Sequence, residues 1–169
     1  MKQGTLYCVG MGPGDPELVT FKAWHALCRC PVLALPEDQS GRQTAAAILK
    51  EAAARQEGLH LEEKDILSLT FPMTRDAGRL RKAHSDASDK VAAVLDGGCD
   101  IALITLGCPT VYASCMYIQK EIRRRGYETV VIPGITSFSA AAARLGQPLC
   151  EKDEPLLIVP AGRDDLPDL

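Results

Sequence analysis

Three short turns contain the residues best suited to hold a ligand. They have the sequences GMGPGDP at 10–16, GCPTVY at 107–112 and PGITSFS at 133–139. Glycine lets backbone amides and carbonyls approach a ligand closely, so each turn is a candidate binding loop. An equally good interpretation of the local sequence is a tight turn in which Thr136 or Ser137 only caps a helix.

The first turn invites comparison with the dinucleotide-binding pattern GxGxxG, but it departs from that pattern. After Gly10 and Gly12, the position of the third glycine is occupied by Asp15. A carboxylate there is expected to cap the following helix and to occupy the N–H groups that a pyrophosphate needs. The sequence also has no GxSxG elbow, no Walker lysine and no evident acid–base pair. The sequence therefore fits best a reaction that needs no nucleophile from the protein, and we assign no catalytic residue.

The elements that must position these turns follow from the apolar periodicity. Short apolar runs predict five strands, at 5–9, 32–35, 65–69, 100–105 and 129–132. Apolar stripes at helical spacing predict helices at 15–28, 45–58, 80–94, 111–125 and 136–145. Strands joined by helices indicate an α/β fold, here a five-stranded, mainly parallel sheet flanked by helices. The turns that follow parallel strands share one edge of the sheet, so we expect the three turns together.

Composition narrows the class of protein. A chain of 169 residues with 46% hydrophobic residues predicts one domain with a packed core, and a net charge of −3 argues against a nucleic-acid partner. No apolar run is long enough for a signal peptide or a membrane span. The cysteines form no CxxC pair and the three histidines are scattered, so we expect no metal site, no disulfide and a cytoplasmic location. The seven cysteines are Cys8, Cys28, Cys30, Cys99, Cys108, Cys115 and Cys150.

The C-terminal part of the chain differs from the rest. A charged segment at 151–155 precedes a last apolar run at 156–159. We interpret this run as the first strand of a second α/β domain that is cut short. The expected organisation is an α/β domain at 1–150, followed by a linker and the start of a truncated domain at 151–169.

Four segments, taken in order, carry a resemblance to a known family. They read LYCVGMGPGDPELVTFKA, SLTFPMTRD, LITLGCPTVYAS and VIPGITSFSAAAARLGQPL. Together they resemble the tetrapyrrole methylase family, and most closely its precorrin-2 C20-methyltransferase branch. The resemblance implies a two-domain homodimer that binds S-adenosylmethionine between its domains. It also implies methylation of C20 of precorrin-2 or its cobalt-containing counterpart, cobalt-factor II, in cobalamin biosynthesis. A sulfonium is an activated methyl donor, which would explain why the chain has no nucleophile motif.

The resemblance also implies roles for particular residues. Arg75 is expected to meet the carboxylates of the anionic tetrapyrrole, because the arginine fork matches a carboxylate. We interpret the nearby Arg79, Arg81 and Lys82 as a solvated helix start. The expected contacts of S-adenosylmethionine are Pro13, Leu106, Gly107, Cys108, Val111, Tyr112, Thr136 and Ser137.

The chain departs from the family pattern in two places. The family has Gly-Asp-Pro where this chain has Gly107-Cys108-Pro109, and the chain ends at Leu169, before the second domain. A carboxylate about 4 Å from a sulfonium contributes roughly 1 to 4 kcal/mol, which a neutral Cys108 would lose. We therefore expect this chain alone to bind the cofactor weakly and to turn over no substrate.

Three interpretations remain open at this point. The first is an active methyltransferase whose remainder is absent from this chain. The second is a truncated, inactive paralogue or fragment that acts as a binding or assembly subunit. The third is an unrelated nucleotide-binding α/β protein, which the failed glycine pattern disfavours.

Overall fold

One sheet of five parallel strands forms the centre of the protein. The computed structural model describes residues 3–38, 41, 43–74 and 76–160. The strand order in the sheet is β3-β2-β4-β1-β5, and every neighbouring pair is parallel. The carboxyl ends of all five strands therefore lie at one edge. The strands are β1 (Leu6–Gly10), β2 (Val32–Glu37), β3 (Asp65–Thr70), β4 (Ile101–Thr105) and β5 (Thr129–Ile132).

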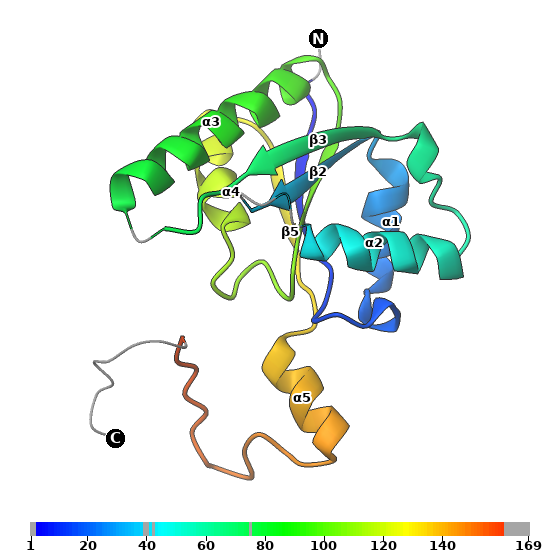
Figure 1. Ribbon diagram of the computed structural model, residues 1–169, viewed down its shortest axis with the longest axis vertical. Coiled ribbons are helices and arrows are strands. Elements are labelled where there is room, and N and C mark those ends of the chain that lie inside the picture. Colours follow the sequence, from blue (N-terminus) through cyan, green and yellow to red (C-terminus); the bar gives the residue numbers. More distant parts are fainter. Residues whose placement is uncertain (1–2, 39–40, 42, 75, 161–169) are drawn as a thin grey trace.

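Helices cover both faces of this sheet, as Figure 1 shows. Two of them, α1 and α2, pack on one face, whereas α3 and α4 pack on the other. The α-helices are α1 (Phe21–Arg29), α2 (Thr44–Arg55), α3 (Ala77–Asp96), α4 (Cys115–Arg124) and α5 (Ser137–Leu145), and the two 3-10 turns are η1 (Pro16–Leu18) and η2 (Leu61–Glu63).

The central strands β1 and β4 are almost wholly apolar because the sheet is buried on both faces there, whereas the edge strand β3 is mostly exposed and contains Asp65, Ser68 and Thr70. Successive side chains of a strand point to opposite faces. In β1, Val9 packs with Trp24 and the other core residues of α1 and α2, whereas Cys8 packs with Val91 of α3 and Ile118 of α4. Continuous apolar strands of this kind are typical of parallel sheets with helices on each side. The α/β class and the five-stranded sheet predicted from the sequence are confirmed.

The first predicted helix is wrong in its extent. The segment at 15–28 splits into η1 and α1, because it contains two capping residues. The Asp15 carboxylate accepts a hydrogen bond from the Glu17 N–H at 2.9 Å and caps η1. The Thr20 hydroxyl accepts one from the Ala23 N–H at 3.2 Å and caps α1. The chain thus turns once more before the longer helix begins.

Two further predictions differ from the structure. The helix predicted from 111 begins only at Cys115, because the chain turns at Tyr112, whose φ of 49° is incompatible with a right-handed helix. Residues 156–159 form no strand in the described chain. An isolated apolar run needs a neighbouring strand to complete its hydrogen bonds, and no described strand lies beside this one.

The last helix, α5, leaves the body of the protein. It has no buried residue, and Figure 1 shows it extending beyond the edge of the sheet. All seven cysteines are free thiols. Within the described ranges, no three His, Cys, Asp or Glu side chains gather closely enough to hold a metal ion. None of the helices described here has the length and hydropathy needed to cross a bilayer.

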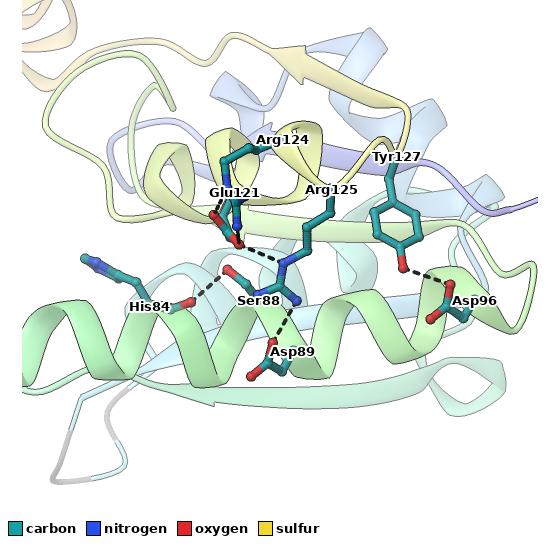
Figure 2. Close-up of polar contacts among 8 residues, drawn as sticks. All are labelled: His84, Ser88, Asp89, Asp96, Glu121, Arg124, Arg125 and Tyr127. Carbon is teal, nitrogen blue, oxygen red and sulfur yellow. Dashed lines mark hydrogen bonds and ion pairs between the residues drawn. The ribbon is translucent and has the colours of Figure 1, made fainter.

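A polar network joins α4 to α3. Figure 2 shows Arg125 between two carboxylates: it donates to Asp89 at 2.7 Å and to Glu121 at 2.8 Å. The hydrogen bonds from Arg124 and Arg125 lower the pKa of Glu121 to about 2. Tyr127, just after α4, donates to Asp96 at 2.8 Å. Each exposed ion pair contributes little to the stability of the fold. Together these contacts join the C-terminal end of α4 to α3, and α4 begins shortly after the second glycine turn.

An aromatic cluster lies at the other end of the α3–α4 contact. The His84 ring stacks on Tyr117, with 4.7 Å between ring centroids, and lies 5.7 Å from Phe71. Its Nε2 atom is buried and has no hydrogen-bond partner among the described residues. Burial lowers the pKa of His84, because the charged imidazolium loses solvation there.

Acid is therefore expected to destabilise the fold through His84. The pKa in the folded state lies below the usual 6.5, so the unfolded chain binds more protons below that value. The stability that the neutral ring contributes is present above about pH 6.5 and is lost as the pH falls towards the folded-state pKa. His84→Phe keeps an aromatic ring that cannot be protonated. It should show a smaller fall in urea midpoint between about pH 7.5 and about pH 5.5. A variant with the acid sensitivity of the wild type would contradict this assignment.

Candidate functional site

The three glycine turns meet at the carboxyl edge of the sheet. A Cβ atom added to Gly10 would lie 2.6 Å from the Gly107 carbonyl oxygen and 2.5 Å from the Gly134 nitrogen. One added to Gly134 would overlap the same carbonyl oxygen. Two hydrogen bonds join the first two turns, from the Gly12 N–H to the Gly107 carbonyl at 3.2 Å and from the Gly107 N–H to the Gly12 carbonyl at 2.7 Å. Only glycine permits this contact, which brings the predicted turns together.

A cavity of about 300 Å³, here called the glycine-turn cavity, opens beside these turns. Its wall contains all eight residues that the family resemblance assigned to the cofactor. They come from three turns that are distant in sequence. The other lining residues follow α5 or lie within it. The eight are Pro13, Leu106, Gly107, Cys108, Val111, Tyr112, Thr136 and Ser137, and the others are Phe138, Ile158, Val159 and Pro160.

A second cavity of about 500 Å³, here called the β2–β4 cavity, adjoins the first. The two share Leu106, Val111 and Tyr112 as lining residues. The larger cavity lies at the carboxyl ends of β2 and β4, beside the first residues of α2. Sequence reasoning missed Glu37, which ends β2 and lines this cavity. Its position at the carboxyl end of a predicted strand was the signal that could have found it.

Cys108 lies in a turn that stabilises its thiolate. Its side chain is almost fully buried, and its Sγ atom lies 3.2 Å from the Thr110 hydroxyl oxygen. Burial alone would raise the pKa of the thiol. Hydrogen bonds from the Thr110 hydroxyl and from the N–H groups of Thr110 and Gly134 outweigh this effect, so the pKa lies below the usual 9.0.

Tyr112 and Thr136 both line the glycine-turn cavity. The Tyr112 hydroxyl donates to the Ile158 carbonyl at 3.2 Å and so holds the C-terminal segment beside the cavity. Thr136 occupies the N-cap position of α5, but its side chain makes no capping bond to the backbone. Its Oγ1 atom lies 2.8 Å from the Ser139 hydroxyl instead. Thr136 is therefore not simply a helix cap, and the first N–H groups of α5 have no side-chain cap.

The basic residues near α3 divide into two groups. Arg75, the predicted substrate contact, lies outside the described residues. Arg79, Arg81 and Lys82 are exposed in the first turns of α3, in agreement with a solvated helix start. The Asp76 carboxylate caps this helix by accepting hydrogen bonds from the next residues, with the Arg79 N–H at 3.0 Å.

Comparison with known proteins identifies the family. The family model described as Tetrapyrrole (Corrin/Porphyrin) Methylases matches residues 5–169. The chain belongs to the tetrapyrrole methylase family. The family resemblance inferred from the four sequence segments is thereby confirmed.

Two curated relatives are similar over most of this methylase chain. It is 38% identical over 160 residues to the probable cobalt-precorrin-2 C(20)-methyltransferase of Methanocaldococcus jannaschii, covering 94% of the chain and 65% of that protein. It is 33% identical over 165 residues to the precorrin-2 C(20)-methyltransferase of a Sinorhizobium species, covering 93% of the chain and 64% of that protein. The chain thus spans just under two thirds of the length of these relatives.

A solved structure shares the fold. Uroporphyrin-III C-methyl transferase from Thermus thermophilus, complexed with S-adenosylhomocysteine, matches this methylase chain with a TM-score of 0.57 and 25% sequence identity. The match covers 89% of the chain and 55% of that structure. The described part of the chain therefore corresponds to one part of a larger methylase.

Removal of the Thr110 hydroxyl is expected to raise the pKa of Cys108. Thr110→Val deletes a donor to Sγ, so the pH profile of Cys108 alkylation by iodoacetamide should move to higher pH. Mass spectrometry of the Cys108 peptide measures the rate at each pH. Thr129→Val, at a hydroxyl that instead accepts from Gln119, is the matched control. Identical profiles for Thr110→Val and the wild type would contradict the hydrogen-bonded thiolate.

Proposed function

We propose that this chain is the cofactor-binding part of an S-adenosylmethionine-dependent methyltransferase. The proposed reaction is methylation of C20 of precorrin-2 or cobalt-factor II in cobalamin biosynthesis. The observation that carries the proposal is the glycine-turn cavity, because one wall combines all eight expected cofactor contacts. The two C20-methyltransferase relatives support the choice of substrate.

The lining of the glycine-turn cavity fits a nucleoside attached to a sulfonium. The close packing of Gly10 and Gly134 against the Gly107 carbonyl brings the three turns together beside this cavity, which Gly107 itself lines. Leu106 and Val111 offer apolar surface, and the Thr136 hydroxyl offers a polar contact. The Cys108 thiol lines the same wall, and its pKa lies below the usual 9.0. S-adenosylmethionine, when bound, supplies a methyl group that needs no further activation.

The work left to the protein is alignment and exclusion of water. The shared wall of Leu106, Val111 and Tyr112 places the β2–β4 cavity next to the glycine-turn cavity. We assign the larger cavity to the methyl acceptor, because methyl transfer requires the sites of the donor and the acceptor to adjoin. Holding the two in line accelerates a transfer that lacks a protein nucleophile. Arg75 remains our proposed contact for the carboxylates of the substrate.

A second function, as a binding or assembly subunit, is favoured by the exposed apolar surface near the C-terminus. Leu145 is 73% exposed on α5, and Leu149 is also exposed. The run at 156–159 is exposed as well. Such surface is typical of a contact with another domain or chain, and we propose a homodimer. Seven free thiols suit a reducing compartment, which supports a cytoplasmic location.

Calorimetric titration tests the proposed cofactor site and the role of Cys108. The wild-type chain should bind both S-adenosylmethionine and S-adenosylhomocysteine, weakly. Cys108→Asp should tighten binding of the sulfonium compound about fivefold, equal to about 1 kcal/mol, because a full carboxylate charge faces it. The same variant should not bind S-adenosylhomocysteine more tightly, because that compound lacks the sulfonium charge. Cys108→Ser, a neutral variant of similar size, is the control.

Two outcomes would contradict this account. Failure of the wild-type chain to bind either compound would reject the cofactor site. Methylation of precorrin-2 by the 169-residue chain at an ordinary enzyme rate would reject the expectation that the chain alone turns over no substrate.

A further inference from the structure

The β2–β4 cavity contains a carboxylate that the proposed methyl transfer does not yet use. Glu37 ends β2, and its side chain is held from two sides. Its Oε2 atom accepts a hydrogen bond from the Gln43 side-chain amide at 2.9 Å, and its Oε1 atom accepts one from the Thr70 hydroxyl at 2.9 Å. Thr70 lies directly opposite Glu37 in the register of β2 and β3. The carboxylate is therefore fixed at the mouth of the cavity by neighbouring elements.

These hydrogen bonds also keep Glu37 in its charged form. The bonds from Gln43 and then Thr70 lower the pKa of this carboxyl group. The Ser68 hydroxyl also contributes to this shift. A carboxylate can accept about four hydrogen bonds, so these three donors leave capacity for one from a ligand. Apolar side chains, including Phe71, Met73 and Leu103, line the same cavity. A ligand that combines apolar surface with a hydrogen-bond donor fits this lining.

Resting on the proposed function, we infer that Glu37 accepts a hydrogen bond from a ring N–H of a tetrapyrrole bound in the β2–β4 cavity. A tetrapyrrole of this pathway carries its carboxylates on the periphery and its N–H donors inside the ring. The periphery would be repelled by Glu37, whereas a ring N–H is attracted to it. Asp38, the other charged lining residue in the described chain, lies beside Glu37 and has the same sign.

This contact fixes the orientation of the macrocycle. With the ring nitrogens towards Glu37, the peripheral carboxylates lie at the rim of the cavity. Met73 lines the cavity two positions before Arg75, which we proposed as the carboxylate contact. On the opposite side, Leu106, Val111 and Tyr112 separate the ring from the glycine-turn cavity. Glu37 is thus a positioning residue that holds one face of the ring, next to the cavity of the methyl donor.

The test uses the full 169-residue chain and uroporphyrinogen III, a reduced, non-planar tetrapyrrole with eight carboxylates whose pyrrole N–H groups can turn to one face of the ring. Binding is measured by calorimetric titration under nitrogen. Glu37→Gln removes the charge and keeps the shape, and it should weaken binding about three- to tenfold. Glu57→Gln makes the same change in charge at an exposed residue beyond the end of α2, and it should leave binding unchanged.

A second variant and a second ligand make the test decisive. Glu37→Asp keeps the charge but withdraws the oxygens, so it should also weaken uroporphyrinogen binding. Tricarballylate carries carboxylates without a ring N–H, and its binding should not weaken in Glu37→Gln. Stronger or unchanged uroporphyrinogen binding by Glu37→Gln would overturn the inference. So would unchanged binding by Glu37→Asp if Glu37→Gln does not fold.

The same samples separate this inference from the proposed function. If the wild-type chain binds S-adenosylhomocysteine but not uroporphyrinogen III, the role of Glu37 is rejected and the cofactor site stands. If the chain binds neither compound, both proposals are rejected. Weakened uroporphyrinogen binding in Glu37→Gln together with unchanged S-adenosylhomocysteine binding is the expected result.

Discussion

The close approach of three backbone segments at Gly10, Gly107 and Gly134 is the constraint on which the rest of the site depends. Gly10 ends β1, and Gly107 and Gly134 lie just after β4 and β5, the two neighbours of β1 in the sheet, so the three backbone segments come into direct contact. Without side chains at these positions, the turns pack backbone against backbone. The glycine-turn cavity then forms from residues flanking the contact, and the β2–β4 cavity shares its wall.

Because the site is built mainly from backbone, we expect its framework to persist when one side chain changes. The family resemblance places Cys108 where aspartate is expected, and the donors around it include the N–H groups of Thr110 and Gly134, which do not depend on the side chain at 108. These donors favour an anion, whether carboxylate or thiolate. The substitution therefore changes the strength of the charge and leaves the framework of the turn intact.

The sequence predicted the framework well because local signals determine it. Apolar runs bounded by glycine indicated all five strands, and the three turns were correctly expected at one edge. The predictions fail where the structure depends on helix capping or on contacts between residues that are distant in sequence. Thr20 starts a new helix after Asp15 has capped a turn, and the positive φ of Tyr112 delays α4. Glu37 was missed because its fixed position depends on Gln43 and Thr70, which come from other elements.

The measurement that tests this account most directly compares Gly134→Ala with Gly78→Ala by thermal unfolding. A Cβ at Gly134 meets the backbone of Gly107 and Gly10, whereas one at Gly78 meets the Asp76 carboxylate oxygen at 3.2 Å, a side-chain atom that can move. Gly134→Ala should destabilise the chain by about 1 to 3 kcal/mol, and Gly78→Ala should be neutral or stabilising. Equal stability of Gly134→Ala and the wild type would contradict the claim that the glycine contact holds the site together.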